Sequence, residues 1–435
     1  MRERRRTASW QRASADATRA ATRTGTAAPA DRWTFPLYVF VVHWLLVQIP
    51  ASLALLWGMP NAPSPPYGRL PPPMTGLAHV IIEPLRQWDG LWYRLIALDG
   101  YVGPTESAKA AFWPLYPWLM EAGHRLTGLA PETIGYLISN IGFAVALVLL
   151  YRLVALDFGA AIARGTLWAI ALFPTALFFS AVYTESLFLL LAVGALLAAR
   201  TDRWWLAGVA GALAALTRSY GVFLCLPFAI LLWQRHRFDL RRWFPAAIPA
   251  AFPVLGPAIF AWFLQQTQGN WRAFVDVQAQ WNRYQAMPWQ TLHCGIWSCF
   301  DLGGEPDGAK WGWAWAFLNN PSVATTNAWR VAVANSDTLE LVVTILFLAL
   351  AVLGLRLLPA WQSAYVLPGL LIPLFSPSSV HALMSMPRFV LPLFPLFTVL
   401  AILLCSPKLA IPAAVVSSIL LALLSIQFAL WYWVS

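Results

Sequence analysis

Charged residues are scarce in this sequence. Asp, Glu, Lys and Arg make up only 11% of the 435 residues, against about 25% in a typical soluble domain. Hydrophobic residues make up 59%, the mean hydropathy is +0.61, and apolar windows of about 17–23 residues recur along the chain. This composition excludes an ordinary soluble domain and predicts an all-α polytopic membrane protein.

Acidic residues are fewer than basic ones, with 19 Asp and Glu against 29 Lys and Arg and a formal net charge of +10. Residues 1–32 are rich in Arg, Ala and Thr and directly precede the first apolar run. Orientation in the membrane and anionic lipid headgroups account for this basic segment without nucleic acid. We expect it to be a disordered cytoplasmic tail. The apolar run that follows lacks a small-residue cleavage site, so no cleaved signal peptide is expected.

Cysteine is also rare, and the four cysteines form no metal-ligand pattern. There is no Gly-rich phosphate loop, no H-E-x-x-H motif and no G-x-S-x-G motif. We therefore expect neither a metal nor a cofactor. Cys294 and Cys299 lie in one loop, where a short disulfide fits if the loop faces an oxidising space; two free thiols are the alternative.

The basic residues also set the expected topology. The cluster at 235–242 is the strongest internal basic loop and is assigned to the cytoplasm. Counting apolar segments from this loop gives about 11 transmembrane helices, with the N-terminus inside. Residues 33–435 then form one membrane domain, with 58–130 as the first extracytoplasmic loop and 266–337 as a Trp-rich second one. The short piece at 111–123 cannot cross once in this scheme, so we expect interfacial helices in the first loop. The expected segments are 33–57, 133–151, 162–181, 184–199, 203–217, 219–233, 243–265, 338–357, 361–379, 387–404 and 409–433.

The stretch QWDGLWYRLIALDGY, at residues 87–101, places an acid among aromatic residues. Read as a helix from Asp89, its spacing predicts an apolar face of the kind that lies in a membrane interface. The residues on that face are Trp92, Tyr93 and Ile96. Asp89 either caps this helix or takes part in chemistry. Of the nearest other acids, Glu83 is expected to be exposed and Asp99 to end the helix.

Further polar residues interrupt apolar runs, all at outer ends of segments in this topology. They are Tyr183, Thr184, Glu185, Arg218, His381 and Arg388. Ionisable groups at membrane depth usually face a cavity or a partner, so this set predicts a polar cavity on the outer side. Alternatives exist for single residues: Arg218 could snorkel to the interface, Glu185 could pair with an arginine, and His381 reads best as a packing residue. For Arg218 and Arg388 we favour function.

A carboxylate, two guanidinium groups and an aromatic cavity suit glycosyl transfer from a lipid-linked sugar phosphate. Asp89 would take the proton of an acceptor hydroxyl as its oxygen attacks the anomeric carbon. An arginine would hold the departing phosphate. We predict Asp89 as the catalytic base. The predicted substrate-binding residues are Trp88, Gly90, Tyr93, Tyr183, Glu185, Arg218 and Arg388.

A series of motifs runs in order through most of residues 80–400. They are WDG-x-x-Y-x-x-I-A-x-x-GY (88–101), FWPLYP (112–117), Asn140, FPTALFFSAVYTESLF (173–188), TRSYG (217–221) and MPRFVLPLFP (386–395). In these motifs the chain resembles the PIG-V-type mannosyltransferases of the GT-C superfamily. The resemblance implies a GT-C-type multi-helix bundle, a polyprenyl- or dolichyl-phosphate mannose donor and transfer with inversion. Tyr220 stands where the eukaryotic pattern has Asn, so acceptor contacts at this position are not carried over. The Arg-rich tail and the compact length resemble a bacterial member of the family, where no GPI anchor is made, so the acceptor itself is not carried over either.

A lipid or sugar transporter and a non-catalytic assembly subunit are the competing interpretations. No internal repeat with paired broken helices supports a transporter, and the polar groups gather on one side. An assembly subunit would tolerate loss of Asp89, whereas an enzyme would not. The sequence thus predicts an inverting mannosyl- or hexosyltransferase of the plasma membrane with an extracytoplasmic active site. Its expected partners are a polyprenyl-phosphate sugar donor and a lipid or glycolipid acceptor.

Overall fold

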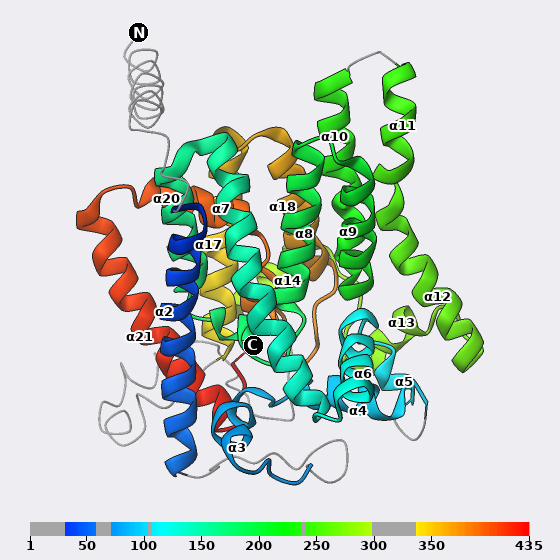
Figure 1. Cartoon of the computed structure of the whole chain (residues 1–435), viewed down its shortest axis with the longest axis vertical. Coiled ribbons are helices and arrows are strands. Elements are labelled where there is room, and N and C mark those ends of the chain that lie inside the picture. Colours follow the sequence, from blue (N-terminus) through cyan, green and yellow to red (C-terminus); the bar gives the residue numbers. More distant parts are fainter. Residues whose placement is uncertain (1–30, 58–70, 103–105, 237–239, 298–335, 435) are drawn as a thin grey trace.

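The computed structural model describes residues 31–434 except for 58–70, 103–105, 237–239 and 298–335 (Figure 1). Within these ranges the chain is all-helical, and its one bridge of β type is an isolated antiparallel pair between Arg283 and Ser378. Most of the expected basic tail lies outside the described residues. The first helices are α2 (Asp31–Ala54), η1 (Leu55–Trp57), α3 (Leu77–Ile81), η2 (Glu83–Leu85), α4 (Asp89–Asp99), α5 (Glu106–Lys109), α6 (Leu115–Thr127), α7 (Pro131–Ala171), η3 (Ala176–Phe179), α8 (Glu185–Arg200) and α9 (Trp204–Thr217). They are followed by η4 (Ser219–Leu224), α10 (Cys225–His236), α11 (Leu240–Ala250), η5 (Phe252–Val254), α12 (Leu255–Gln268), α13 (Ala273–Asp276), η6 (Val277–Trp281), α14 (Pro288–Trp297), α17 (Ser336–Leu357), α18 (Ala360–Phe375), α19 (Met386–Phe389), α20 (Phe394–Leu403) and α21 (Pro407–Ala429).

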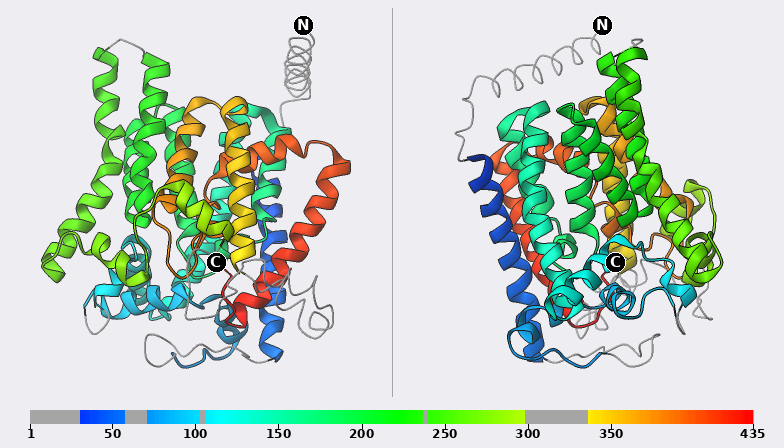
Figure 2. Two further views of the ribbon diagram at one scale, coloured as in Figure 1. Left: turned by 180° about the vertical axis from the view of Figure 1, so that it is seen from behind. Right: turned by 45° about the vertical axis from the view of Figure 1, so that its right-hand side comes forward.

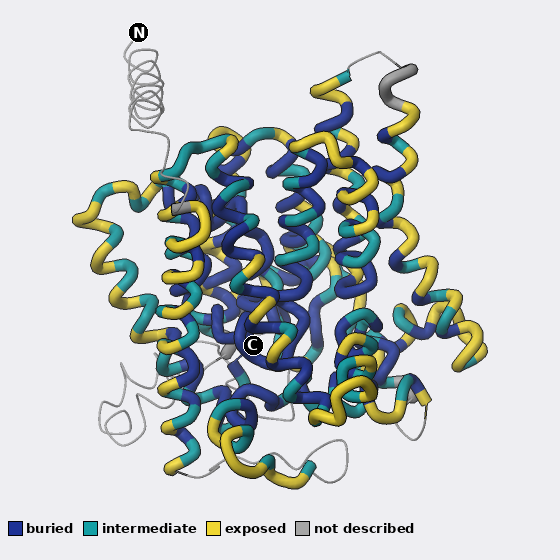
Figure 3. Tube along the Cα trace, viewed as in Figure 1, coloured by how far each residue is buried: buried dark blue, intermediate teal, exposed yellow. Residues whose placement is uncertain are grey.

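Five described helical segments are long and apolar enough to cross a membrane. They are Arg32–Ala54, Pro131–Ala171, Phe244–Gln268, Thr338–Leu357 and Pro407–Ala429. Three shorter apolar helices, α9, α18 and α20, accompany them. Exposed residues follow the outer faces of α2, α12 and α21 (Figure 3), and many are apolar, such as Val41 and Ile411. The protein is therefore a helical membrane protein, while the count of eleven spans stays a prediction.

Helix α7 is broken at Gly159, whose φ of 81° and ψ of 168° are not helical. Glycine adopts a positive φ without the steric clash of a Cβ atom. The break falls between the two segments, 133–151 and 162–181, that the sequence predicts. The second piece ends at Ala171, earlier than expected, because Pro174 has no N–H for a helical hydrogen bond and disfavours helix in the residue before it.

Residues 172–184 leave the regular helix inside the bundle. Irregular backbone at membrane depth is tolerated only where its polar groups find partners within the protein. Helix α7 supplies such partners: Asn140 Nδ2 donates to Ser180 O at 3.1 Å, and Ser139 Oγ donates to Tyr183 O at 3.0 Å. The family-like residue Asn140 thus fixes the segment that leads into α8.

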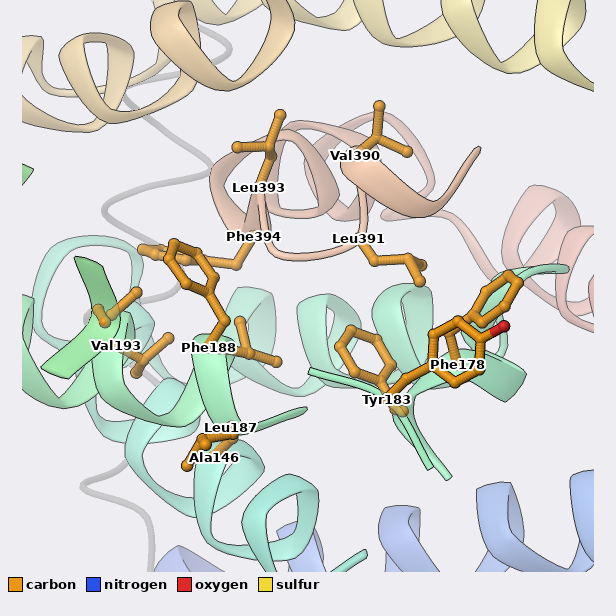
Figure 4. Close-up of a cluster of buried hydrophobic side chains, with 14 of the residues drawn as sticks. Ala146, Phe178, Tyr183, Leu187, Phe188, Val193, Val390, Leu391, Leu393 and Phe394 are labelled. Atoms are coloured by element: carbon orange, nitrogen blue, oxygen red, sulfur yellow. The ribbon is translucent and has the colours of Figure 1, made fainter. Parts of the chain in front are cut away.

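The irregular segment also packs against a second break, between α18 and α20. Figure 4 shows buried side chains of 178–193 facing those of residues 390–394, and Phe188, Leu391 and Phe394 are fully buried. Thr175 Oγ1 donates to Pro387 O at 2.8 Å across the same contact. Two segments about 200 residues apart in sequence are therefore held together in the core.

Ion pairs connect several helices of the bundle near their ends. At one end Arg200 pairs with Asp157 and Arg235 pairs with Asp202, which ties α7, α8, α9 and α10 together. This is the end that the positive-inside rule assigns to the cytoplasm. Helices α4, α5 and α6 lie at the opposite end, away from the tips of α10 and α11 (Figures 1 and 2).

Helix α4 begins at Asp89 and ends at Asp99, as the sequence predicts. Its apolar face does not meet a membrane interface, because Trp92 and Tyr93 are only 3% and 4% exposed. Trp92 stacks on Phe112 with ring centroids 5.4 Å apart. The expected interfacial contact is thus wrong for this face: the spacing marks an apolar face but does not say whether lipid or protein covers it.

Candidate active site

A cavity of about 420 Å³ lies among α4, the ends of α8 and α9, the segment 274–283 and the segment 384–389. Among the described residues on its wall, Asp89 is the only one with a carboxylate. The cationic wall residues are Arg218, Arg283 and Arg388. The aromatic ones are Tyr93, Phe112, Trp113, Tyr220, Phe274, Trp281, Phe389 and Trp433. One anionic group therefore faces three cations in an aromatic chamber.

The Asp89 side chain does not cap its helix. Trp88 is the N-cap residue, and no side-chain capping hydrogen bond is present. Instead Asp89 Oδ2 accepts a hydrogen bond from Arg388 Nη1 at 2.5 Å, and the Asp89 N–H donates to Tyr183 Oη at 3.1 Å. Oδ1 has no hydrogen bond to any described residue and is left for a ligand. These contacts set aside the capping interpretation of Asp89.

The backbone before Asp89 is held in an unusual conformation. Trp88 has φ 55° and ψ −116°, which L-residues with a bulky side chain rarely adopt. Its indole packs on Trp431 and Trp433, with centroids 5.9 and 5.1 Å away. Such strain persists only where surrounding contacts fix it, and it is often found at functional sites. The C-terminal segment thus sets the direction in which α4 presents Asp89.

Glu185, the first residue of α8, is fully buried. Its Oε1 accepts a hydrogen bond from Arg218 Nη1 at 2.5 Å and lies 2.8 Å from Arg388 Nε. A buried carboxylate is stable only with such partners. Because Arg388 also holds Asp89, Glu185 sets the orientation of the guanidinium that holds the cavity carboxylate. Glu185 is therefore a positioning residue.

The three arginines surround one phenyl ring. The guanidinium carbons of Arg218, Arg283 and Arg388 lie 5.4, 5.7 and 5.9 Å from the centroid of Phe389. Cations at this distance are attracted by the face of an aromatic ring, which offsets part of their mutual repulsion. With Asp89 and Glu185 included, this group has a formal charge of +1. The arrangement favours an anionic ligand.

Arg283 differs from the other two arginines in its partners. It donates to the carbonyl oxygens of Ser376 at 2.7 Å and Met384 at 3.4 Å, and it forms no ion pair with a described carboxylate. Burial and the positive charge of Arg388 lower the pKa of Arg283 to about 10, so it stays charged at neutral pH. It is thus the cation whose charge is least compensated by the protein.

Three aromatic side chains of the cavity wall carry a polar atom that lacks a partner in the described structure. Tyr220 Oη, Trp281 Nε1 and Trp433 Nε1 are buried, and none of them forms a hydrogen bond with a described residue. Burial, and then the charge of Asp89, raise the pKa of Tyr93, which keeps its hydroxyl neutral. Apolar rings with a few polar atoms are typical of sites that bind small hydroxylated ligands.

The predicted site residues divide into two sets. Asp89, Tyr93, Arg218 and Arg388 line the cavity. The residues behind or beside the wall are Trp88, Gly90, Tyr183 and Glu185. The Gly90 α-carbon faces Val182, where a Cβ atom would lie 3.5 Å from the carbonyl oxygen, so Gly90 contacts the protein and not the cavity.

Tyr183 supports the site through its hydroxyl and its ring. The hydroxyl accepts from Asp89 N and donates to Gln87 O at 3.3 Å, and the Arg388 guanidinium lies 5.2 Å from the ring centroid.

Glu83, expected to be exposed, is buried and pairs with Arg86 at 2.7 Å. Glu83 Oε2 accepts a hydrogen bond from the N–H of Met74 at 2.7 Å, so the residues just before α3 fold back over Glu83.

Arg283, Trp281 and Trp433 are cavity residues that the sequence interpretation missed. Arg283 and Trp281 lie in the region 266–337, which carries no family motif, and Trp433 lies at the end of the last apolar run. A basic residue between aromatic ones, as in the sequence WNRY, was the only signal for Arg283. Their contribution depends on long-range packing, which no local pattern encodes.

The disulfide between Cys294 and Cys299 and the absence of a bound metal remain predictions. Cys299 lies outside the described residues, so its disulfide with Cys294 is not addressed by the structure. Within the described ranges, no group of three or more His, Cys, Asp or Glu side chains has an arrangement that could hold a metal ion.

Residues 37–240 match the family model described as Mannosyltransferase (PIG-V). The match agrees with the family that the motifs indicate, and it suggests a glycosyltransferase. It includes Asp89, Glu185 and Arg218, and it ends before Arg283 and Arg388. Searches among curated proteins and among solved structures give no match.

Proposed function

We propose that this chain transfers a mannosyl residue from a polyprenyl phosphate to a lipid or glycolipid acceptor, with inversion at the anomeric carbon. Its residues 37–240 match the PIG-V mannosyltransferase family. The observation that carries the proposal is the 420 Å³ cavity, in which the lone wall carboxylate of Asp89 faces three arginines. A base and a cluster of cations are what attack by a hydroxyl and departure of a phosphate require.

In the proposed step, the acceptor hydroxyl oxygen bonds to the anomeric carbon while Asp89 takes its proton. The bond between the anomeric carbon and the phosphate oxygen breaks, and its electron pair leaves with polyprenyl phosphate. Arg283 and the neighbouring arginines stabilise the negative charge that grows on this oxygen. The tyrosine and tryptophan groups on the wall contact the sugar. No nucleotide takes part.

An assay with purified full-length protein in liposomes tests this function. We expect transfer of radiolabelled mannose from synthetic polyprenyl-phosphate mannose to one member of a panel of lipids and glycolipids, with stoichiometric release of polyprenyl phosphate. The control is protein carrying Asp89→Asn, which should fold and transfer mannose at a greatly reduced rate. Movement of the intact labelled donor across the bilayer without transfer would instead establish the transporter interpretation.

The proposed side of the membrane gives a separate prediction. Single cysteines introduced into a background without native cysteines, at Arg125 near the cavity end and at Lys408 near the other end, should react with an impermeant maleimide from opposite sides of the membrane. Both side chains are exposed, so reagent access is not a confounder. Labelling of the Arg125 position from the cytoplasmic side alone would contradict an extracytoplasmic active site.

A further inference from the structure

A second, larger cavity of about 710 Å³ lies near the other end of the bundle, between α7, α8 and α9 and close to the start of α2. It shares no residue with the Asp89 cavity. Its apolar wall consists of Leu149, Leu156, Leu190, Leu191, Leu197 and Leu206. The proposed transfer reaction does not use this space.

The mouth of this cavity is basic. Arg32, Arg152 and Arg203 line it, and none of them forms an ion pair with a described carboxylate. Two acids on adjoining helix ends already have other partners, because Asp157 pairs with Arg200 and Asp202 pairs with Arg235. Arg152 is held in place above the ring of Trp33, 4.1 Å from its centroid. The cavity therefore has three arginines on its wall, and no described carboxylate is paired with them.

A buried hydroxyl group adds a second polar feature. Tyr151 lines the cavity and is only 2% exposed, yet its hydroxyl has no hydrogen-bond partner in the described structure. A buried hydroxyl without a hydrogen-bond partner is unfavourable, so a residue kept in this state indicates a partner that occupies the cavity. Phe35 packs beside the ring at a centroid distance of 6.4 Å and fixes its direction.

We propose that this cavity binds one anionic glycerophospholipid, with its phosphate at Arg152, Arg203 and Arg32 and an acyl chain along the leucines. A soluble anion would leave the apolar wall unused, and a zwitterionic lipid would gain less from the three arginines. The ligand is thus a lipid of the leaflet at this end, which the positive-inside rule makes the cytoplasmic one.

Native mass spectrometry of the full chain tests the proposal. The purified protein is incubated with equal amounts of phosphatidylglycerol and phosphatidylethanolamine, and bound lipids are counted. We expect one phosphatidylglycerol to be retained selectively. Each arginine strengthens binding of an anionic lipid by roughly fivefold, so Arg152→Ala with Arg203→Ala should weaken retention about 20–30-fold. Tyr151→Phe should weaken it roughly 2–10-fold.

The matched control removes two exposed charges elsewhere, Arg125→Ala and Lys408→Ala, and should leave retention unchanged. A further variant, Leu191→Trp, fills the apolar wall without altering charge and should also reduce binding. Melting temperature and gel filtration without added lipid confirm that each variant is folded. Equal retention of both lipids, or a loss of the same size in the control, would overturn the proposal. Mannosyl transfer is not a readout here, so the two proposals fail independently.

Discussion

Replacing Asp89 with Asn is expected to lower turnover by about 10²–10⁴-fold, the contribution of a positioned general base. Asn has nearly the same shape and retains an acceptor oxygen toward Arg388, so folding should be preserved. The KM for the polyprenyl-phosphate donor should change little, since the phosphate is expected to contact the arginines. Steady-state kinetics with the donor varied separate the two quantities.

Asp99→Asn is the matched control for this variant. Asp99 ends the same helix and is exposed, so its loss should leave turnover near that of the unmodified protein. Glu185→Gln distinguishes the base from the positioning residue, because Glu185 is fully buried away from the cavity wall. If Asp89→Asn retained full turnover while Glu185→Gln abolished it, the assignment of the base would be wrong.

Replacing Arg283 with Met should lower kcat/KM for the donor by about 10–100-fold, because a hydrogen bond to a charged group contributes about 1.5–3 kcal/mol. Met keeps much of the apolar stem and removes the charge. Arg283→Lys should recover only part of the loss, since an ammonium group lacks the planar fork that binds two phosphate oxygens. The loss should be seen with donors that carry a phosphate. Inhibition by free mannose, which has no phosphate, should be affected less by the substitution.

Arg272→Met, in the same region of the chain, controls for loss of a positive charge. Arg272 is exposed, lies beside the ring of Trp271 and is not part of the cavity wall. It should leave donor kinetics unchanged. If both variants lowered kcat/KM for the donor equally, Arg283 would act only through the overall electrostatic potential of the protein. The proposed contact with the phosphate would then be disproved.

The convergence of the site could be anticipated in part. Asp89, Arg218 and Arg388 line one cavity although up to 299 positions separate them. They could be grouped because each ionisable residue interrupts an apolar run on the same side of the expected topology. The boundaries of α4 could also be predicted from the sequence, since Asp at a helix start and Gly after its end are strong local signals.

The features that sequence could not supply depend on packing between distant segments. The face of Trp92 and Tyr93 has the periodicity of a lipid-facing helix, but it is covered by aromatic residues of the protein. Glu83 was expected to be exposed because it precedes a proline, whereas Arg86 and the Met74 N–H bury it. Arg283 lies in a region without periodicity, so only the fold brings it to Phe389.

The ion pair between Asp89 and Arg388 also has a consequence for biosynthesis. Translation proceeds at about 5–20 residues per second, so Glu185 enters the membrane roughly 10–40 s before Arg388 leaves the ribosome. Throughout this interval Glu185 already has Arg218 as a partner, only 33 positions later in the sequence, whereas Asp89 has no guanidinium partner. A carboxylate without a counter-charge near the membrane is unfavourable, and the Asp89–Arg388 ion pair spans 299 positions, so this pair forms only once the chain is nearly complete.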